Sequence, residues 1–127
     1  INFSGRQRML SQKIVKEVLI LHYVSDTVSS TQTSHLQNVL SLWTKSQNAL
    51  KNGSDSLAFP KEKSETLHKL YLEINPIFNK IAETTDLFLL NLKQKKQSAE
   101  NQKLVQVILE NEGSFLSKMN QIVTQYD

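Results

Sequence analysis

The chain begins with the stretch Ile1-Asn2-Phe3-Ser4-Gly5-Arg6-Gln7-Arg8-Met9-Leu10-Ser11-Gln12-Lys13, which opens a long helical pattern. The stretch carries two arginines, a lysine and a glycine where an ordinary core helix carries leucines. At heptad spacing, the helix that it opens has two seams instead of one. Because a helix in a small monomer needs only one buried face, the second seam predicts a partner helix.

The first seam has the composition of the core face of a helical bundle. Its members are Phe3, Gln7, Leu10, Ile14, Glu17, Leu21, Val24 and Val28. The second seam follows the same spacing on the nearly opposite side of the helix. Its members are Ile1, Gly5, Arg8, Gln12, Val15, Leu19 and His22. Since Arg8 belongs to the second seam one turn after Gly5, we expect Arg8 at the contact with the partner helix.

Length and composition favour one helical domain. The 127 residues fit a single unit over 1–127, large enough for a core but not for two. Three glycines, two prolines and a hydrophobic content of 39% argue for helices. The absence of cysteine excludes disulfides and thiolate metal sites. A net charge of +3 is mild, and without a basic face with interleaved aromatics we expect no nucleic-acid partner.

We expect four helices joined by short connections. The first runs from about residue 2 to 29. A polar turn follows over 29–34, where Thr33 or Ser34 serves as N-cap of the second helix. Asn52-Gly53 ends the second helix, because both residue types accept the left-handed conformation of a C-cap.

The third helix is predicted to start near Lys61–Ser64 and to end in the basic run Lys93–Lys96, whose charge complements the negative end of the helix dipole. Pro76 lies inside this pattern and predicts a kink or a short break near Asn75, since proline lacks the backbone donor and clashes with the preceding turn. The segment 54–60 before this helix is predicted to be irregular.

The fourth helix begins after Ser98 and runs to about Tyr126. Four helices of this length with short connections predict an all-α fold, an antiparallel up-down four-helix bundle. The first and fourth helices then place both chain ends at one end of the rod. This geometry suits a module excised from between two transmembrane helices, and no stretch within the chain approaches the ~18 consecutive apolar residues of a membrane span.

The sequence contains no catalytic constellation. The histidines His22, His35 and His68 fall on different predicted helices without a metal-ligand spacing. A Gly-rich phosphate loop, a nucleophile elbow and an HExxH motif are all missing. Glu17 is the one acidic residue of the core seam, and Lys13 one turn earlier is its predicted partner. We therefore expect neither an enzyme, nor a metal site, nor a cofactor.

The opening motif also resembles known families. The run Ile-Asn-x-x-Gly-x-x-Arg-Met-x-Ser over residues 1–11 resembles the start of the sensor domains in nitrate/nitrite sensor kinases. The fuller Gly-Arg-Gln-Arg-Met-Leu-Ser-Gln over residues 5–12 is similar to the N-terminal domain of type IV pilus chemotaxis transducers, the PilJ-type domain. The resemblance is strong over residues 1–14, and beyond them it rests on helix layout.

The resemblance implies an extracytoplasmic sensor domain of a bacterial transmembrane receptor, either a histidine kinase or a chemoreceptor. In the nitrate sensors, both subunits contribute the arginine of the Gly-x-x-Arg-Met motif, which holds nitrate at the dimer interface. Arg8 takes that place and Gly5 matches the motif glycine. Lys13 stands where those sensors carry a second arginine. Phe3 replaces a basic residue and weakens the positive field, whereas Arg6, typical of the pilus-type domains, adds charge on another face.

Physical chemistry supports the same site. If the first helix pairs with its twofold mate, two Arg8 guanidinium groups converge, and Gly5 lets the backbones approach. Such like charges repel by about 1 kcal/mol even in water. A small anion between them removes the repulsion, and planar nitrate or nitrite suits the flat guanidinium fork. We thus expect a parallel homodimer through the first helix. The candidate ligand-binding residues are Arg8, Gly5, Lys13, Gln12 and Arg6.

Alternatives stay open at two levels. Arg8 and Gln12 can be polar residues that only specify the dimer register, or Arg8 can be a surface arginine whose stem covers apolar neighbours. At the level of function, the alternatives are a dimerising helical interaction module that signals without a small-molecule ligand and a cytosolic helical adaptor. Anion-dependent stability of the dimer separates the sensor from the interaction module.

Overall fold

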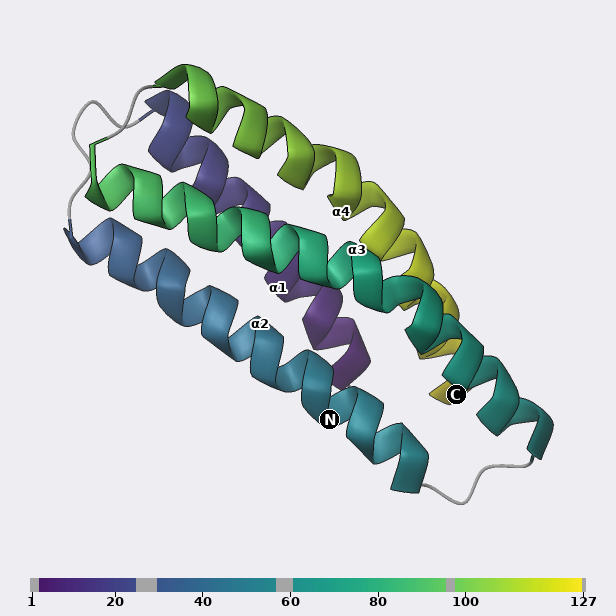
Figure 1. Ribbon diagram of the computed structural model, residues 1–127. Helices are drawn as coiled ribbons and strands as arrows, with labels where there is room; N and C mark the ends of the chain where they lie inside the picture. Colours follow the sequence, from purple (N-terminus) through teal and green to yellow (C-terminus); the bar gives the residue numbers. More distant parts are fainter. Residues whose placement is uncertain (1–2, 25–29, 57–60, 96–97, 127) are drawn as a thin grey trace.

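The computed structural model describes residues 3–24, 30–56, 61–95 and 98–126. Within these ranges the chain folds into four α-helices and one short π-helix. They are α1 (Phe3–Leu19), the π-helix η1 (Ile20–Val24), α2 (Ser30–Ser56), α3 (Lys61–Lys93) and α4 (Ser98–Tyr126). Because the described ranges contain no strand, they confirm the all-α prediction. The helices lie along one elongated bundle (Figure 1), in which α1 packs against α2 and α4, and α3 packs against the same two helices.

Polar contacts between helices show how α1 is placed in the bundle. Residues near the start of α1 contact residues late in α2 or α4. Residues near the end of α1 and in η1 contact residues early in α2 or α4. The four contacts are Gln7–Gln47, Glu17–His35, Arg8–Asn120 and His22–Gln102. The first turns of α1 therefore lie beside the last turns of α4.

The core seam predicted for the first helix is buried over its middle part and fails at its end. Gln7, Leu10, Ile14 and Leu21 are buried, as the heptad pattern predicts. Val24, predicted in the same seam, is 71% exposed. The physical reason is the π-helix η1, whose wider turn shifts the side chains beyond Leu21 out of the α-helical period.

The other three helices bury further core positions at helical spacing. These are Leu36, Leu40, Trp43, Gln47, Leu67, Leu70, Ile74, Ile81, Thr84, Phe88, Ile108, Phe115, Met119 and Ile122. The ring of Trp43 lies at the centre, with its centroid 4.5 Å from that of Phe78 and 5.0 Å from that of Phe115. Contacts at these distances are typical of favourable aromatic pairs, so α2, α3 and α4 meet in one aromatic cluster.

Two predicted boundaries of the second helix are wrong. The helix begins at Ser30, so residues 30–34 of the predicted polar turn are helical, and Thr33 lies inside the helix instead of capping it. The Thr33 hydroxyl donates to the Ser30 carbonyl oxygen at 3.1 Å, a bond that satisfies a hydroxyl within a helix. Asn52-Gly53 does not end the helix either, because α2 continues to Ser56 and no described glycine has a positive φ.

Of the kink or short break predicted near Asn75, the break is wrong. Pro76 lies inside α3, which is continuous from Lys61 to Lys93. Ile74 and Phe78 on either side of the proline are buried in the core, and this packing outweighs the loss of one backbone hydrogen bond. None of the described helices is both long and apolar enough to span a membrane.

Candidate functional site

Arg8 lies near the start of α1, on the side that faces α4. Its Nη1 donates to Oδ1 of Asn120 at 2.6 Å. Its Nε is buried and has no hydrogen-bond partner. No carboxylate of the described residues pairs with Arg8. Because an arginine stays charged in proteins, the site holds a half-buried positive charge that a neutral amide orients but does not neutralise.

Part of the side of α1 that was predicted to contact a second copy lies against α4 of the same chain. Arg8 reaches α4 at one end, and at the other end Nε2 of His22 lies 3.0 Å from Oε1 of Gln102. Between them, Val15 and Leu19 pack against the core. A helix in a four-helix bundle has two neighbours, so its buried surface is wider than the single face that the sequence argument allowed. The second seam alone therefore does not require a dimer.

The structure brings together only some of the predicted ligand-binding residues. Gly5 and Gln12 lie one turn before and one turn after Arg8, on the same side of α1. Arg6 and Lys13 lie on a different side of the helix, because neither is three or four residues from Arg8. Gln12 and Lys13 are exposed, and Arg6 is half-buried.

The outward face of α1, defined here by Gly5, Met9, Gln12 and Lys16, lies beside Arg8. Met9 is 56% exposed. Gln12 and Lys16 are exposed as well. In a single chain, this face of the motif helix is therefore open to solvent and not to the core.

Gln7 fixes the motif to α2 from the inside of the bundle. Its Nε2 donates to the backbone oxygen of Trp43 and to Oε1 of Gln47, both at 2.9 Å. The three side chains are buried, and Gln7 Oε1, Trp43 Nε1 and Gln47 Nε2 have no hydrogen-bond partner. Since Gln7 directly precedes Arg8, this network sets the rotation of α1 about its own axis at the site.

The sequence pattern placed Gln7 in the core, but it did not predict the hydrogen-bond partners of Gln7. It also did not predict Asn120 as the hydrogen-bond partner of Arg8. The signal for Gln7 was a polar residue in an apolar seam, because a buried amide needs hydrogen-bond partners. For Asn120 no local signal exists, since the bond to Arg8 joins residues 112 positions apart.

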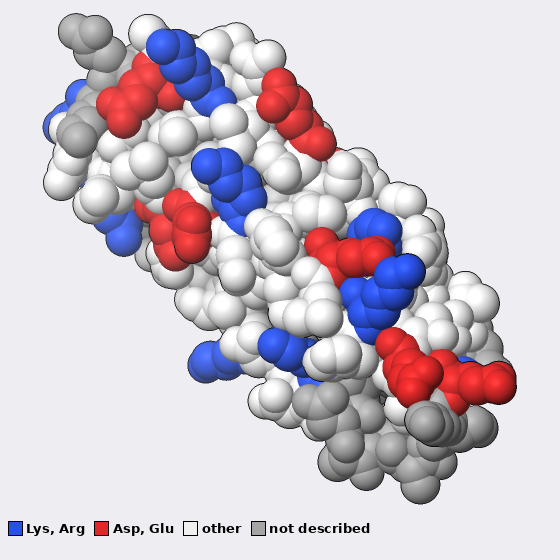
Figure 2. All heavy atoms as spheres, turned by 45° about the vertical axis from the view of Figure 1, so that its right-hand side comes forward, with Lys and Arg blue, Asp and Glu red and all other residues white. Residues whose placement is uncertain are grey.

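Ionisable groups elsewhere in the bundle have shifted pKa values. Burial raises the pKa of Glu112 on α4 and that of Asp86 on α3. The hydrogen bond from Lys118, 2.6 Å long, lowers the pKa of Glu73. Figure 2 shows positive and negative side chains interspersed on the visible face of the bundle. Among the described residues, no three or more His, Cys, Asp or Glu are placed to hold a metal ion.

Comparison with known families assigns a class to this helical chain. Residues 1–107 match the model of the PilJ family, described as the type IV pili methyl-accepting chemotaxis transducer N-terminal domain. The match covers most of the chain, which therefore belongs to this family. It confirms the PilJ-type resemblance, whereas the comparisons give no support to the resemblance to nitrate/nitrite sensor kinases. Comparison with curated proteins and with solved structures gives no significant match.

Proposed function

We propose that the chain is the extracytoplasmic ligand-binding domain of a transmembrane chemotaxis transducer and that it binds a small oxyanion, nitrate or nitrite, at Arg8. The observation that carries the proposal is the electrostatic state of Arg8. Arg8 is half-buried as a residue, its Nε is buried and has no partner, and its one described hydrogen bond goes to a neutral amide. A charge of this kind gains more from an anion than a solvated surface arginine does, since water screens it less.

The proposed assembly is an antiparallel up-down bundle that dimerises in parallel through the outward face of α1. The cross-helix contacts support the antiparallel order, because residues early in α1 meet residues late in both neighbours. The exposed Met9 and the small Gly5 support close approach of two copies at this face. Two Arg8 groups beside the twofold axis then donate to one anion from both sides.

The proposed signal is a change in the α1–α4 contact. An anion competes with Asn120 for the Arg8 guanidinium, and an ionised acceptor forms the stronger hydrogen bond. Ligand binding then shifts α1 relative to α4 and moves the two membrane helices that flank the domain. Such coupling requires that the two packings differ in their affinity for the ligand.

Thermal melting with nitrate, nitrite, sulfate and chloride tests the proposal. Ligand at ~100 times its dissociation constant adds about 2.7 kcal/mol to the stability of the folded state. We expect a nitrate- or nitrite-selective rise in Tm that Arg8→Ala abolishes. Lys45→Ala is the matched control, because it removes an exposed cation from α2, away from the candidate ligand-binding residues. A response that is equal in wild type and Arg8→Ala, or no response to any anion, contradicts the proposal.

A second candidate function is a helical interaction module that signals without a small ligand. The hydrogen bond between Arg8 and Asn120 also favours this function. Arg8 already has a partner in Asn120, so its role can be to join α1 to α4. In that case Arg8→Ala lowers the stability of the domain, and nitrate changes neither the stability nor the dimer dissociation constant of the wild type.

A further inference from the structure

A cavity of about 320 Å³ lies between the end of α1 and the start of α2. Its lining residues are Glu17, Ile20 and Leu21 on one side and Thr31, Gln32 and His35 on the other. Glu17 follows Arg8 by nine residues, which corresponds to about 13 Å along a helix. Because Arg8 faces α4 and the cavity faces α2, the cavity is separate from the proposed anion site.

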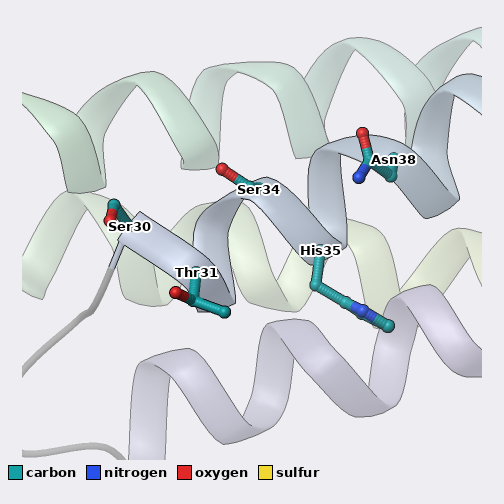
Figure 3. A pocket seen from close by; sticks show the side chains of 5 residues that line it. All are labelled: Ser30, Thr31, Ser34, His35 and Asn38. Atoms are coloured by element: carbon teal, nitrogen blue, oxygen red, sulfur yellow. The ribbon is translucent and has the colours of Figure 1, made fainter.

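Figure 3 shows the adjoining surface of α2, where a second and more open cavity of about 420 Å³ is lined by Ser30, Thr31, Ser34, His35 and Asn38. Thr31 and His35 line both cavities. In Figure 3, His35 extends from α2 toward α1. The His35 side chain therefore forms a wall between the two cavities.

Glu17 is the charged group of the first cavity. Its Oε1 lies 2.8 Å from Nε2 of His35, and not beside Lys13 as the sequence predicted. Its Oε2 is buried and has no hydrogen-bond partner. A carboxylate accepts up to about four hydrogen bonds, so Glu17 has unused acceptor capacity. No lysine or arginine lines the cavity to supply the missing donor.

The floor of the cavity is apolar. Leu21 is buried, and Ile20 is half-buried. Both belong to the π-helix η1, whose extra residue per turn widens the helix beside the cavity. Segments of this kind occur often at functional sites. An apolar floor beside a carboxylate fits a ligand with an alkyl body and a cationic end.

We propose that this cavity binds a small organic cation, a primary amine with a short alkyl chain. Its ammonium group donates to Glu17 and to the Thr31 hydroxyl, and its alkyl chain lies on Ile20 and Leu21. The His35 side chain is 50% exposed, so its ring can turn outward and leave both Glu17 oxygens to the amine. The cavity volume is at the small end of known ligand pockets, which suits a few carbon atoms.

The test measures binding of n-butylammonium to the folded domain by calorimetry and by NMR chemical-shift perturbation. We expect shifts at the backbone amides of residues 17–21 and 31–35, and no shifts there with n-butanol or butyrate at the same concentration. Glu17→Gln should weaken binding at least tenfold. Glu83→Gln, which removes an exposed carboxylate from α3, is the matched control and should bind like the wild type.

Two further variants keep the test decisive. His35→Ala removes the competing donor, so it should bind n-butylammonium at least as tightly as the wild type, even if Glu17→Gln fails to fold. Arg8→Ala should retain amine binding while losing the anion response, which separates this proposal from the proposed function. The proposal is overturned if n-butanol gives the same shifts, if the wild type gives none, or if His35→Ala weakens binding.

Discussion

Arg8 and Asn120 are joined across the α1–α4 interface by a hydrogen bond of 2.6 Å from Nη1 to Oδ1. The acceptor is a neutral amide, so it orients the guanidinium without cancelling its charge. The two residues thus provide a fixed cation and a contact that the proposed anion would replace. This pair also links the motif in α1 directly to α4.

The first prediction replaces the neutral acceptor by a charged one. Asn120→Asp gives Arg8 an internal counter-ion at hydrogen-bond distance, and a charge-assisted pair is stronger than the present bond. We expect the nitrate dissociation constant, measured by isothermal calorimetry, to rise at least tenfold. Gln121→Glu is the control, because it adds the same charge at the exposed neighbouring position. If both variants bind nitrate equally, the position of the charge does not matter and Asn120 has no part in the site.

The second prediction concerns the buried amide network of Gln7. Gln7→Leu removes the donor of two hydrogen bonds and leaves Oε1 of Gln47 buried without a donor, which should cost about 1–3 kcal/mol. Replacing both amides removes this stranded acceptor as well, so Gln7→Leu/Gln47→Leu should be more stable than the sum of its single variants predicts. Urea denaturation measures all four free energies of unfolding. Additive single effects would show that the two amides do not interact.

The helical period predicted much of the core because burial of one face follows directly from it. Ile14, for example, is fully buried, as its seam predicts. The predicted start of the second helix was wrong because a residue type that favours helix N-caps also occurs inside helices. Thr33 is a good N-cap residue by type, yet its hydroxyl bonds to a carbonyl of its own helix. Thr85 does the same inside α3, where its hydroxyl donates to the Ile81 carbonyl oxygen at 2.8 Å.

The candidate site was predictable only where a motif is continuous in sequence. Arg8 stands out because it belongs to an eight-residue match, whereas its partner Asn120 lies far along the chain in an ordinary helix. Glu17 shows the same limit. Sequence spacing offered Lys13 as its partner, but His35 of the neighbouring helix lies closer in space. Contacts between helices depend on their relative register, which one sequence does not specify.

The third prediction tests the outward face of α1 as a dimer interface. Met9→Asp places a charge in the proposed contact and should raise the dimer dissociation constant at least tenfold, since two like charges then meet across the twofold axis. Analytical ultracentrifugation over a concentration series measures the constant. Leu72→Asp on α3 is the matched control, because Leu72 is 58% exposed and Met9 is 56% exposed. A monomeric wild type, or equal effects of the two variants, argues against a dimer through α1.

The last prediction follows from the half-buried Glu112 of α4, whose pKa burial raises above its ordinary value of 4.5. Because the folded chain then binds this proton more readily than the unfolded chain, the fold loses stability as the pH rises from 4.5 through the raised pKa. Glu112→Gln should therefore raise Tm near neutral pH and leave it unchanged well below the ordinary pKa, where the carboxyl is protonated in both states. Glu110→Gln, at an exposed position of the same helix, should match the wild type throughout. A gain that is larger in acid than at neutral pH would exclude ionisation as its cause, because only the charged carboxylate is disfavoured by burial.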